Sequence, residues 1–471
     1  MTIEDKIPVE ILQTLNPEIV KEYSLIPYGK SGDSLMCYRK SGCCPDDKLD
    51  MLSAVTGYHI YVSDIDGEAF ARLYIKNYRD GLSRKAGTGK DFLYSLIREA
   101  YFMYCSDIHF ECYESRYRIR FRIDGKLMEQ YSLEQSQYIS LVNQVKILSM
   151  LDIAEKRLPQ DGRLFYKSED IKFDVRVSVM PSVYGEKVVM RLLTRQPELL
   201  EIDNLGLDRK QLADYRTAIG RPFGMILISG PTGSGKSTTL YATLRVLNKE
   251  WNNILTIEDP VEYTLDGVNQ VQLKEEVGLS FPVALRTFLR QDPDVIMVGE
   301  IRDQDTAQMA VRSSLTGHLV LSTIHANSAY GCVQRLVGMG INRYLIADTL
   351  ILMAAQRLVR ILCPYCRQEY FMEGRRIYRP VGCEKCFYTG YRGRKAIYEI
   401  IPVDDDIRTC IRSENADIDR IISNKGISTL SSSGYRLLYS GDTSLEEILP
   451  FAGCEYQVAQ EEVPDRKQMD I

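Results

Sequence analysis

Residues 230–238 read Gly230-Pro231-Thr232-Gly233-Ser234-Gly235-Lys236-Ser237-Thr238, a complete phosphate-binding loop of the form G-x-x-x-x-G-K-S. The apolar run at 225–228 predicts a buried strand before the loop, and residues 239–244 predict a helix after it. Strand, glycine loop and helix in this order favour a nucleotide site over a chance glycine-rich turn. Glycines let backbone N–H groups face phosphate oxygens, and the start of the helix adds the positive end of its dipole. We therefore predict that Lys236 reaches the β- and γ-phosphates of a nucleoside triphosphate and that Ser237 ligates Mg²⁺.

The composition is that of a water-soluble globular protein. The chain has 471 residues, of which 45% are hydrophobic and 26% charged, and its net charge is −5. This balance gives no sign of bulk nucleic-acid binding, so we expect no nucleic-acid partner. No apolar run approaches the roughly 18 residues of a membrane span, and the N-terminus does not read as a secretory signal. We therefore expect a cytoplasmic location, and the twelve cysteines do not indicate a disulfide framework.

Changes in sequence pattern predict a division into domains. A small N-terminal α/β domain is expected at residues 1–84, followed by a polar, glycine-containing linker. Residues 117–123 and 173–179 alternate apolar and polar side chains, and Asp124-Gly125 is a hairpin signal. These features predict an α+β domain at residues 90–200.

The remainder of the chain reads as a nucleotide domain with a tail. From residue 201 onward, apolar runs alternate with helical patterns, which is typical of α/β folds with a parallel sheet. The polar stretch at 455–471 is expected to be a frayed tail.

Three further apolar runs of this domain end in polar side chains. Glu258 follows the run at 254–257, Glu300 ends a second, and His325 ends a third. Ligands of open parallel sheets sit beyond the carboxyl ends of the strands, so these side chains and the loop are expected at one rim. A carboxylate there can hold Mg²⁺ through water or orient an attacking water. Each residue alone could equally be a surface acid or a core histidine, but the three together favour a site.

Four stretches carry a resemblance to a known family. Residues 230–239, 257–263, 289–303 and 315–327 resemble the Walker A, aspartate, Walker B and histidine boxes of the secretion ATPases of type II secretion and type IV pilus assembly. The resemblance extends from about residue 90 to 450. It implies a RecA-like P-loop ATPase core at 201–360 that binds ATP and Mg²⁺.

The resemblance also implies roles for individual residues. Glu258 would position the hydrolytic water, and Asp259 and Glu262 would support the metal and its waters. Glu300 resembles the Walker B glutamate, and His325 would sense the γ-phosphate.

The histidine box departs from the family pattern at two positions. The family usually continues Thr-Asn-Asp-Ala after the histidine, whereas this chain reads Ala326-Asn327-Ser328-Ala329. The lost hydroxyl and carboxylate are expected to weaken a local hydrogen-bond network while His325 remains.

The α+β domain matches the same family. Residues 106–111, 118–127, 157–163 and 176–178 resemble its PAS-like module. In the family, arginines at the positions of Arg163 and Arg176 lean onto the bound nucleotide, and a guanidinium supplies fixed donors to phosphate. From the residues alone, surface arginines on an exposed strand face would be the preferred interpretation.

Four cysteines predict a zinc site. Cys363 and Cys366 form one C-x-x-C pair, and Cys383 and Cys386 form another after sixteen residues, which is a spacing typical of structural Zn²⁺. Cys-Pro-Tyr-Cys also looks like a glutaredoxin active site, but a second pair argues against a redox role. We expect a zinc subdomain at 361–398 and a C-terminal helical subdomain at 399–454. The cysteine segment resembles an insertion of extension and secretion ATPases that retraction ATPases generally lack.

The resemblance implies a homo-hexameric ATPase motor that powers assembly of a type IV pilus or a type II secretion pseudopilus. It would lie peripherally on the inner membrane, with an inner-membrane platform protein and a cytoplasmic docking protein as partners. Three alternatives stay open: a DNA-translocating or competence-related ATPase, a nucleotide-binding regulator without turnover, and a pilus retraction ATPase. The first domain and the cysteine pairs disfavour the last.

Overall fold

The computed structural model describes residues 23–67, 90–168, 171–193, 201–372, 374–413 and 417–451, together with Ile7, Ile11, Thr14, Leu15, Ile19, Val20, Ala69, Phe70 and Leu73. The predicted tail and all but the last residue of the predicted linker lie outside this set. The chain forms two compact units, Met1–Thr194 with Val381–Tyr391, and Arg195–Pro380 with Arg392–Ile471. The finer domain boundaries given above remain predictions.

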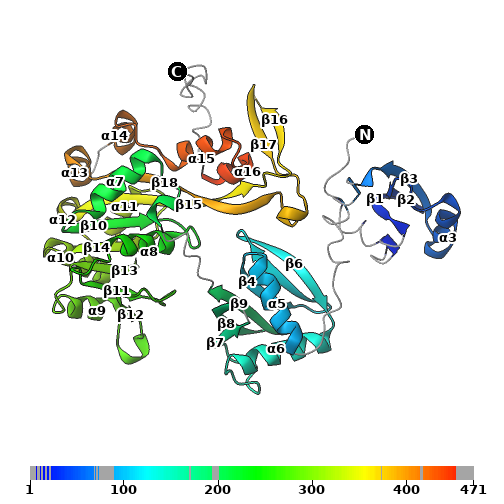
Figure 1. Ribbon diagram of the computed structural model, residues 1–471, viewed down its shortest axis with the longest axis horizontal. Coiled ribbons are helices and arrows are strands. Elements are labelled where there is room, and N and C mark those ends of the chain that lie inside the picture. The colour runs from blue at the N-terminus through cyan, green and yellow to red at the C-terminus, as the bar shows by residue number, and fades with distance from the viewer. Residues whose placement is uncertain are drawn as a thin grey trace. The chain divides into compact units, whose positions relative to one another are not determined.

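The N-terminal part of the first unit is a small α/β element (Figure 1). Its elements are β1 (Leu25–Ser31), β2 (Ser34–Lys40), α3 (Asp46–Thr56) and β3 (His59–Ile65). Strand β2 pairs antiparallel with β1 and parallel with β3. Helix α3 ends at Gly57, whose φ of 75° suits glycine. Leu49 and Leu52 of the helix share a buried cluster with Leu25 and Leu35, which accounts for the mixed pattern seen in the sequence.

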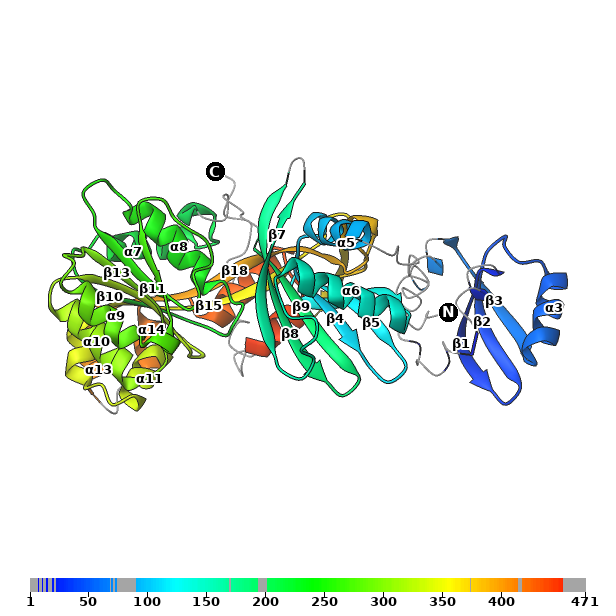
Figure 2. The same cartoon turned by 90° about the horizontal axis from the view of Figure 1, so that it is seen from below.

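The second part of this unit is a six-stranded antiparallel sheet with two helices (Figure 2). Its elements are α5 (Lys90–Phe102), β4 (Cys105–Cys112), β5 (Tyr117–Ile123), β6 (Lys126–Leu133), α6 (Gln135–Leu148), β7 (Gln160–Lys167), β8 (Lys172–Ser182) and β9 (Gly185–Leu193). The strand order is β6-β5-β4-β9-β8-β7. The predicted strands are therefore found in β5 and β8. Asp124 and Gly125 both have positive φ, as the predicted hairpin requires.

One face of this sheet is apolar and the other is charged. Ile119 and Phe121 of β5 are fully buried in a cluster with Leu96 of α5 and Val142 of α6. Because side chains alternate along a strand, the intervening arginines of β5 lie on the opposite face. This alternation explains why the strand could be predicted from sequence.

The second unit is built on a seven-stranded sheet in the order β12-β11-β13-β14-β10-β15-β18. Its strands are β10 (Gly224–Ser229), β11 (Ile254–Glu258), β12 (Asn269–Gln272), β13 (Val295–Ile301), β14 (Leu319–Ile324), β15 (Leu350–Leu362) and β18 (Tyr391–Pro402). The pairs formed by the first six strands in this order are parallel. The prediction of an α/β domain with a parallel sheet is confirmed.

Helices cover both faces of this sheet. The helices along this part of the chain are η3 (Ile202–Asn204), α7 (Arg209–Ile219), α8 (Lys236–Leu247), η4 (Glu275–Val277), α9 (Phe281–Phe288), α10 (Gln304–Leu315), α11 (Gly331–Gly338) and α12 (Arg343–Thr349). Along β10, Leu227 packs into a cluster with α9 and α10, whereas Ile226 and Ile228 pack with α7 and α8. Burial on both faces explains why the strand sequences are continuous apolar runs.

The remaining elements follow β15. A two-stranded hairpin, β16 (Gln368–Met372) with β17 (Arg375–Arg379), and η5 (Glu384–Cys386) lie between β15 and β18. The chain then forms α13 (Asp405–Arg412), α14 (Ile418–Asn424), α15 (Leu430–Tyr439), α16 (Leu445–Ile448) and η6 (Leu449–Phe451). Among the described residues, every helix is too short or too polar to cross a membrane.

Candidate nucleotide-binding site

The phosphate loop joins β10 to α8, as the sequence predicted. Gly235 precedes the helix in the left-handed conformation, with φ of 89°, and no side chain caps the helix. The N–H groups of the first helical turn therefore remain available to an anion. A Cβ on Gly230 would lie 2.6 Å from both the carbonyl oxygen of Gln356 and Oγ of Ser234, so glycine is required at this position.

The side chain of Lys236, the first residue of α8, folds back onto the phosphate loop. Its side chain is buried, and Nζ donates hydrogen bonds to the carbonyl oxygens of Gly230 at 2.8 Å and Pro231 at 3.0 Å. Burial lowers the pKa of Lys236, and the carboxylate of Glu300 counteracts this effect. The next residue, Ser237, is exposed. The ammonium group is therefore held at the loop, and the serine that we expect to bind Mg²⁺ is accessible.

The carboxyl edge of the sheet collects the other predicted residues. Strands β11, β13, β14 and β10 are successive neighbours and run parallel, so their carboxyl ends share one edge. Glu258 is the last residue of β11, Glu300 is the penultimate residue of β13, and His325 directly follows β14. The structure brings Glu300 and His325 together, with 3.5 Å between Oε2 and Nε2.

Arg302 is a member of this cluster that the sequence analysis missed. Its guanidinium forms ion pairs with Glu300 and, at 3.4 Å, with Oδ2 of Asp259. Thus one arginine connects the predicted Walker B glutamate to the aspartate box. A signal was present in the sequence, because Arg302 stands two positions after Glu300 in the stretch 289–303.

Glu258 lies in a separate hydrogen-bond network. The carboxylate is 3% exposed and accepts hydrogen bonds from the hydroxyl of Tyr241, from Oγ1 of Thr256 at 2.6 Å and from Nε2 of Gln270 at 3.0 Å. Burial and the nearby carboxylate raise the pKa of Tyr241, so this hydroxyl stays a donor. The backbone N–H of Glu262 donates to the same hydroxyl oxygen at 3.3 Å. Tyr241 therefore fixes both ends of the aspartate box.

Arg163 and Arg176 lie in the other unit, on the charged face of the six-stranded sheet. They are directly opposite each other across β7 and β8. Arg176 is in turn opposite Arg191 of β9, and Arg191 is opposite Asp107, to which its Nε donates at 2.8 Å. Directly opposed residues of antiparallel strands share a face, so three arginines form one row. Arg191 was not singled out from the sequence.

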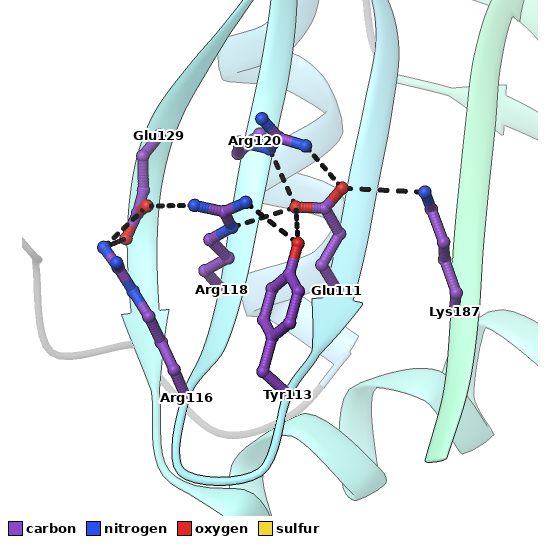
Figure 3. A network of polar contacts seen from close by, with 7 residues as sticks. All are labelled: Glu111, Tyr113, Arg116, Arg118, Arg120, Glu129 and Lys187. Atoms are coloured by element: carbon purple, nitrogen blue, oxygen red, sulfur yellow. Dashed lines mark hydrogen bonds and ion pairs between the residues drawn. The ribbon is translucent and has the colours of Figure 1, made fainter. Parts of the chain in front are cut away.

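A second group of charges lies on the same face (Figure 3). Glu111 is 3% exposed and accepts hydrogen bonds from Arg118 at 2.9 Å and from Arg120 at 2.8 and 2.6 Å. Lys187 approaches the same carboxylate at 3.6 Å, and Arg118 also contacts Glu129 at 3.2 Å. Burial raises the pKa of Glu111, but the two arginines outweigh it and lower the value to about 2. Arg118 and Arg120 are therefore held in place by one buried acid.

The four predicted cysteine ligands lie together. Their sulphur atoms are all within 4.8 Å of one another, and Cys363 and Cys386 are buried. Tetrahedral Zn²⁺ with Zn–S bonds of about 2.3 Å places sulphurs about 3.8 Å apart, and the sulphurs of Cys383 and Cys386 are 3.8 Å apart. The N–H groups of Cys383 and Gly390 donate to the sulphur of Cys386 at 3.1 and 3.3 Å. This donor set fits zinc.

The family model described as "Type II/IV secretion system protein" matches residues 84–450. Type II secretion system protein E of Dickeya dadantii is 42% identical over 454 residues, covering 86% of this chain and 91% of that protein. The type IV pilus assembly ATPase PilB of Myxococcus xanthus is 39% identical over 490 residues, covering 93% and 86% of the two chains.

Two solved structures share the fold. The Legionella pneumophila ATPase DotB is 21% identical with a TM-score of 0.62, covering 79% of this chain and 98% of that one. The pilus retraction motor PilT with bound ADP is 26% identical with a TM-score of 0.55, covering 80% and 98%. Because the family model matches most of the chain and both relatives are about 40% identical to it, this chain belongs to the Type II/IV secretion system protein family.

Proposed function

We propose that this chain is an ATP-hydrolysing motor that powers pilin or pseudopilin assembly in a type IV pilus or a type II secretion system. The observation that carries the proposal is the cluster at the carboxyl edge of the sheet beside the phosphate loop, where Arg302 forms ion pairs with Glu300 and Asp259 and where His325 contacts Glu300. The names of the relatives PilB and type II secretion system protein E support the cellular role.

In the proposed mechanism, the backbone of residues 230–238 and the ammonium of Lys236 bind the β- and γ-phosphates of ATP. Bound Mg²⁺ would neutralise the phosphate charge, with Ser237 as ligand and Asp259 and Glu262 supporting its waters. Glu258 and Glu300 orient the attacking water, and His325 contacts the γ-phosphate.

The assembly is also part of the proposal. The six-stranded sheet is assigned as the PAS-like module, and Arg163 and Arg176 reach the nucleotide within a homo-hexamer. Zn²⁺ would cross-link the four cysteines and stabilise their subdomain. The N-terminal domain contacts a cytoplasmic docking protein at the inner membrane, and the motor acts on an inner-membrane platform protein.

The test is multiple-turnover ATP hydrolysis by the full chain. Glu300→Gln keeps the shape of the side chain but removes its charge, so we expect retained ATP binding and a fall in kcat of about 100-fold or more. Turnover at the wild-type rate by this variant would contradict the proposed site. Hydrolysis that is stimulated by DNA and suppressed by salt would instead indicate a nucleic-acid motor.

A further inference from the structure

Strand β15 supports the phosphate loop from a distant part of the sequence. The carbonyl oxygen of Gln356 lies 2.6 Å from the position that a Cβ on Gly230 would occupy, and Nε2 of Gln356 lies 2.8 Å from the equivalent position on Gly235. Oε1 of Gln356 accepts a hydrogen bond from Thr239 in the first turn of α8 at 2.9 Å. Gln356 is thus packed against both ends of the loop.

The next residue, Arg357, connects this support to the histidine box. Its Nη1 lies 3.3 Å from the Cβ position of Gly230 and donates to the carbonyl oxygen of Gln356 at 2.9 Å. Its Nη2 donates to the carbonyl oxygen of Asn327 at 2.8 Å. Its two terminal nitrogens therefore bind one carbonyl on β15 itself and one in the histidine box. The side chain is half-buried, and this burial lowers the pKa of Arg357, while Glu399 opposes the shift. A guanidinium nevertheless stays charged in proteins.

The residues that follow Asn327 are also held through their backbone. The carbonyl oxygen of Ser328 accepts a hydrogen bond from Oγ of Ser229, at the end of β10, at 3.0 Å. The N–H of Ala329 donates to Oε1 of Glu399, on β18, at 2.7 Å. Three consecutive residues after His325 and Ala326 are thus attached to three different strands. Of these three attachments, the one made by Arg357 also places a side-chain nitrogen beside Gly230 of the phosphate loop.

We propose that Arg357 is a positioning residue that sets the distance between the histidine box and the phosphate loop. This inference rests on the proposed role of His325. One N–H of each terminal nitrogen is used by the carbonyls of Gln356 and Asn327, so the guanidinium holds the main chain of the histidine box against β15. It acts through His325, which Arg357 keeps beside Glu300 and in reach of the phosphate chain. Loss of this link leaves the loop able to bind ATP but misplaces the catalytic groups.

The experiment compares steady-state ATP hydrolysis by the full chain with Arg357→Gln and Arg357→Lys. Because misplacement of about 1 Å can cost about 100-fold, we expect Arg357→Gln to lower kcat by about 10- to 100-fold while KM changes less than about 3-fold. Lysine retains the charge but not the planar fork, so it should recover part of the loss. Arg394→Gln, at an exposed position of β18, is the matched control and should leave kcat unchanged.

A double-mutant cycle with His325→Ala separates positioning from general damage. If Arg357 acts through the histidine box, adding Arg357→Gln to His325→Ala should lower kcat by less than about 2-fold further. Fully multiplied losses would overturn the inference, as would a fall in ATP affinity or in Tm that accounts for the lost activity. A wild-type kcat in Arg357→Gln would overturn the role of Arg357 but leave the proposed function standing. A wild-type kcat in Glu300→Gln would overturn the proposed function itself.

Discussion

Glu111 shows how a single buried carboxylate organises its surroundings. It receives both arginines of β5 that flank it, and its negative charge is the reason that these cations can lie side by side. Their attraction keeps the pKa of Glu111 at about 2 against an ordinary value near 4.5. Such a difference makes the stability of the domain depend on pH.

The sign of this dependence follows from the lowered pKa. Folding is favoured by Glu111 as long as the carboxylate is ionised, so the stabilisation is complete above about pH 4.5 and is lost as the pH falls toward 2. We expect this group to contribute at most about 3 kcal/mol. Urea unfolding of the full chain between pH 5 and pH 2.5, followed by a signal from the unit that contains Glu111, measures this contribution. Glu111→Gln should be less stable at pH 5 and should have a shallower pH profile, and an unchanged profile would contradict this account.

Residues differed in how well the sequence predicted them. Glu300 and His325 could be placed together because each ends an apolar run, and parallel strands end at one edge. Arg302 lies in the stretch 289–303 that resembles the Walker B box, but its ion pairs with Glu300 and Asp259 depend on side-chain conformations that the sequence does not reveal. Gln356 and Arg357 interrupt the apolar run at 350–362, but they lie more than a hundred positions after the phosphate loop, so the sequence did not connect them to it. Contacts through backbone carbonyls have no pattern in the sequence.

At the scale of elements, periodicity predicted the sheets well. The alternation at 117–123 matches β5 residue for residue, since one face is buried and the other is charged. The two cysteine pairs predicted their own clustering because zinc ligands have a characteristic spacing. The hairpin β16–β17 between them was not predicted, since this stretch is mostly polar and, among its described residues, Ile377 alone is fully buried.

Removal of zinc tests whether the metal stabilises the cysteine subdomain. Purified full chain should contain about one zinc per chain, and Cys363→Ser should release it, because binding energy for the metal is also folding energy here. We expect a lower Tm together with ATP affinity within about 3-fold of wild type. Metal analysis and nucleotide titration of the same preparations give both values. A preparation free of zinc with a reversible Cys363–Cys366 disulfide would favour a redox role.

At the scale of the whole molecule, the phosphate loop and the arginine row belong to different compact units. The proposed hexamer allows the arginines of one subunit to serve the nucleotide of its neighbour. Such sharing predicts complementation between two inactive chains. Arg176→Gln retains the loop, whereas Lys236→Ala retains the arginines.

We expect each of these two variants to lose most ATP hydrolysis by itself. After random mixing in equal amounts, about a quarter of the subunit interfaces would contain one intact loop and one intact arginine row. Turnover should therefore rise well above the sum of the separate variants. A mixture of wild type with Lys236→Ala controls for dilution of active chains. Strictly additive rates would mean that each arginine serves its own chain.

Because the histidine box is held through its main chain, its side chains can change without loss of these contacts. The groups that fix residues 327–329 are two carbonyls and one N–H, which every amino acid but proline can supply. The hydroxyl of Ser328 accepts from the N–H of Gly331 at 3.1 Å, a role that an aspartate fills equally well. The chain can therefore carry Ala326 and Ser328 in place of the usual threonine and aspartate while the main chain of the histidine box keeps the same path.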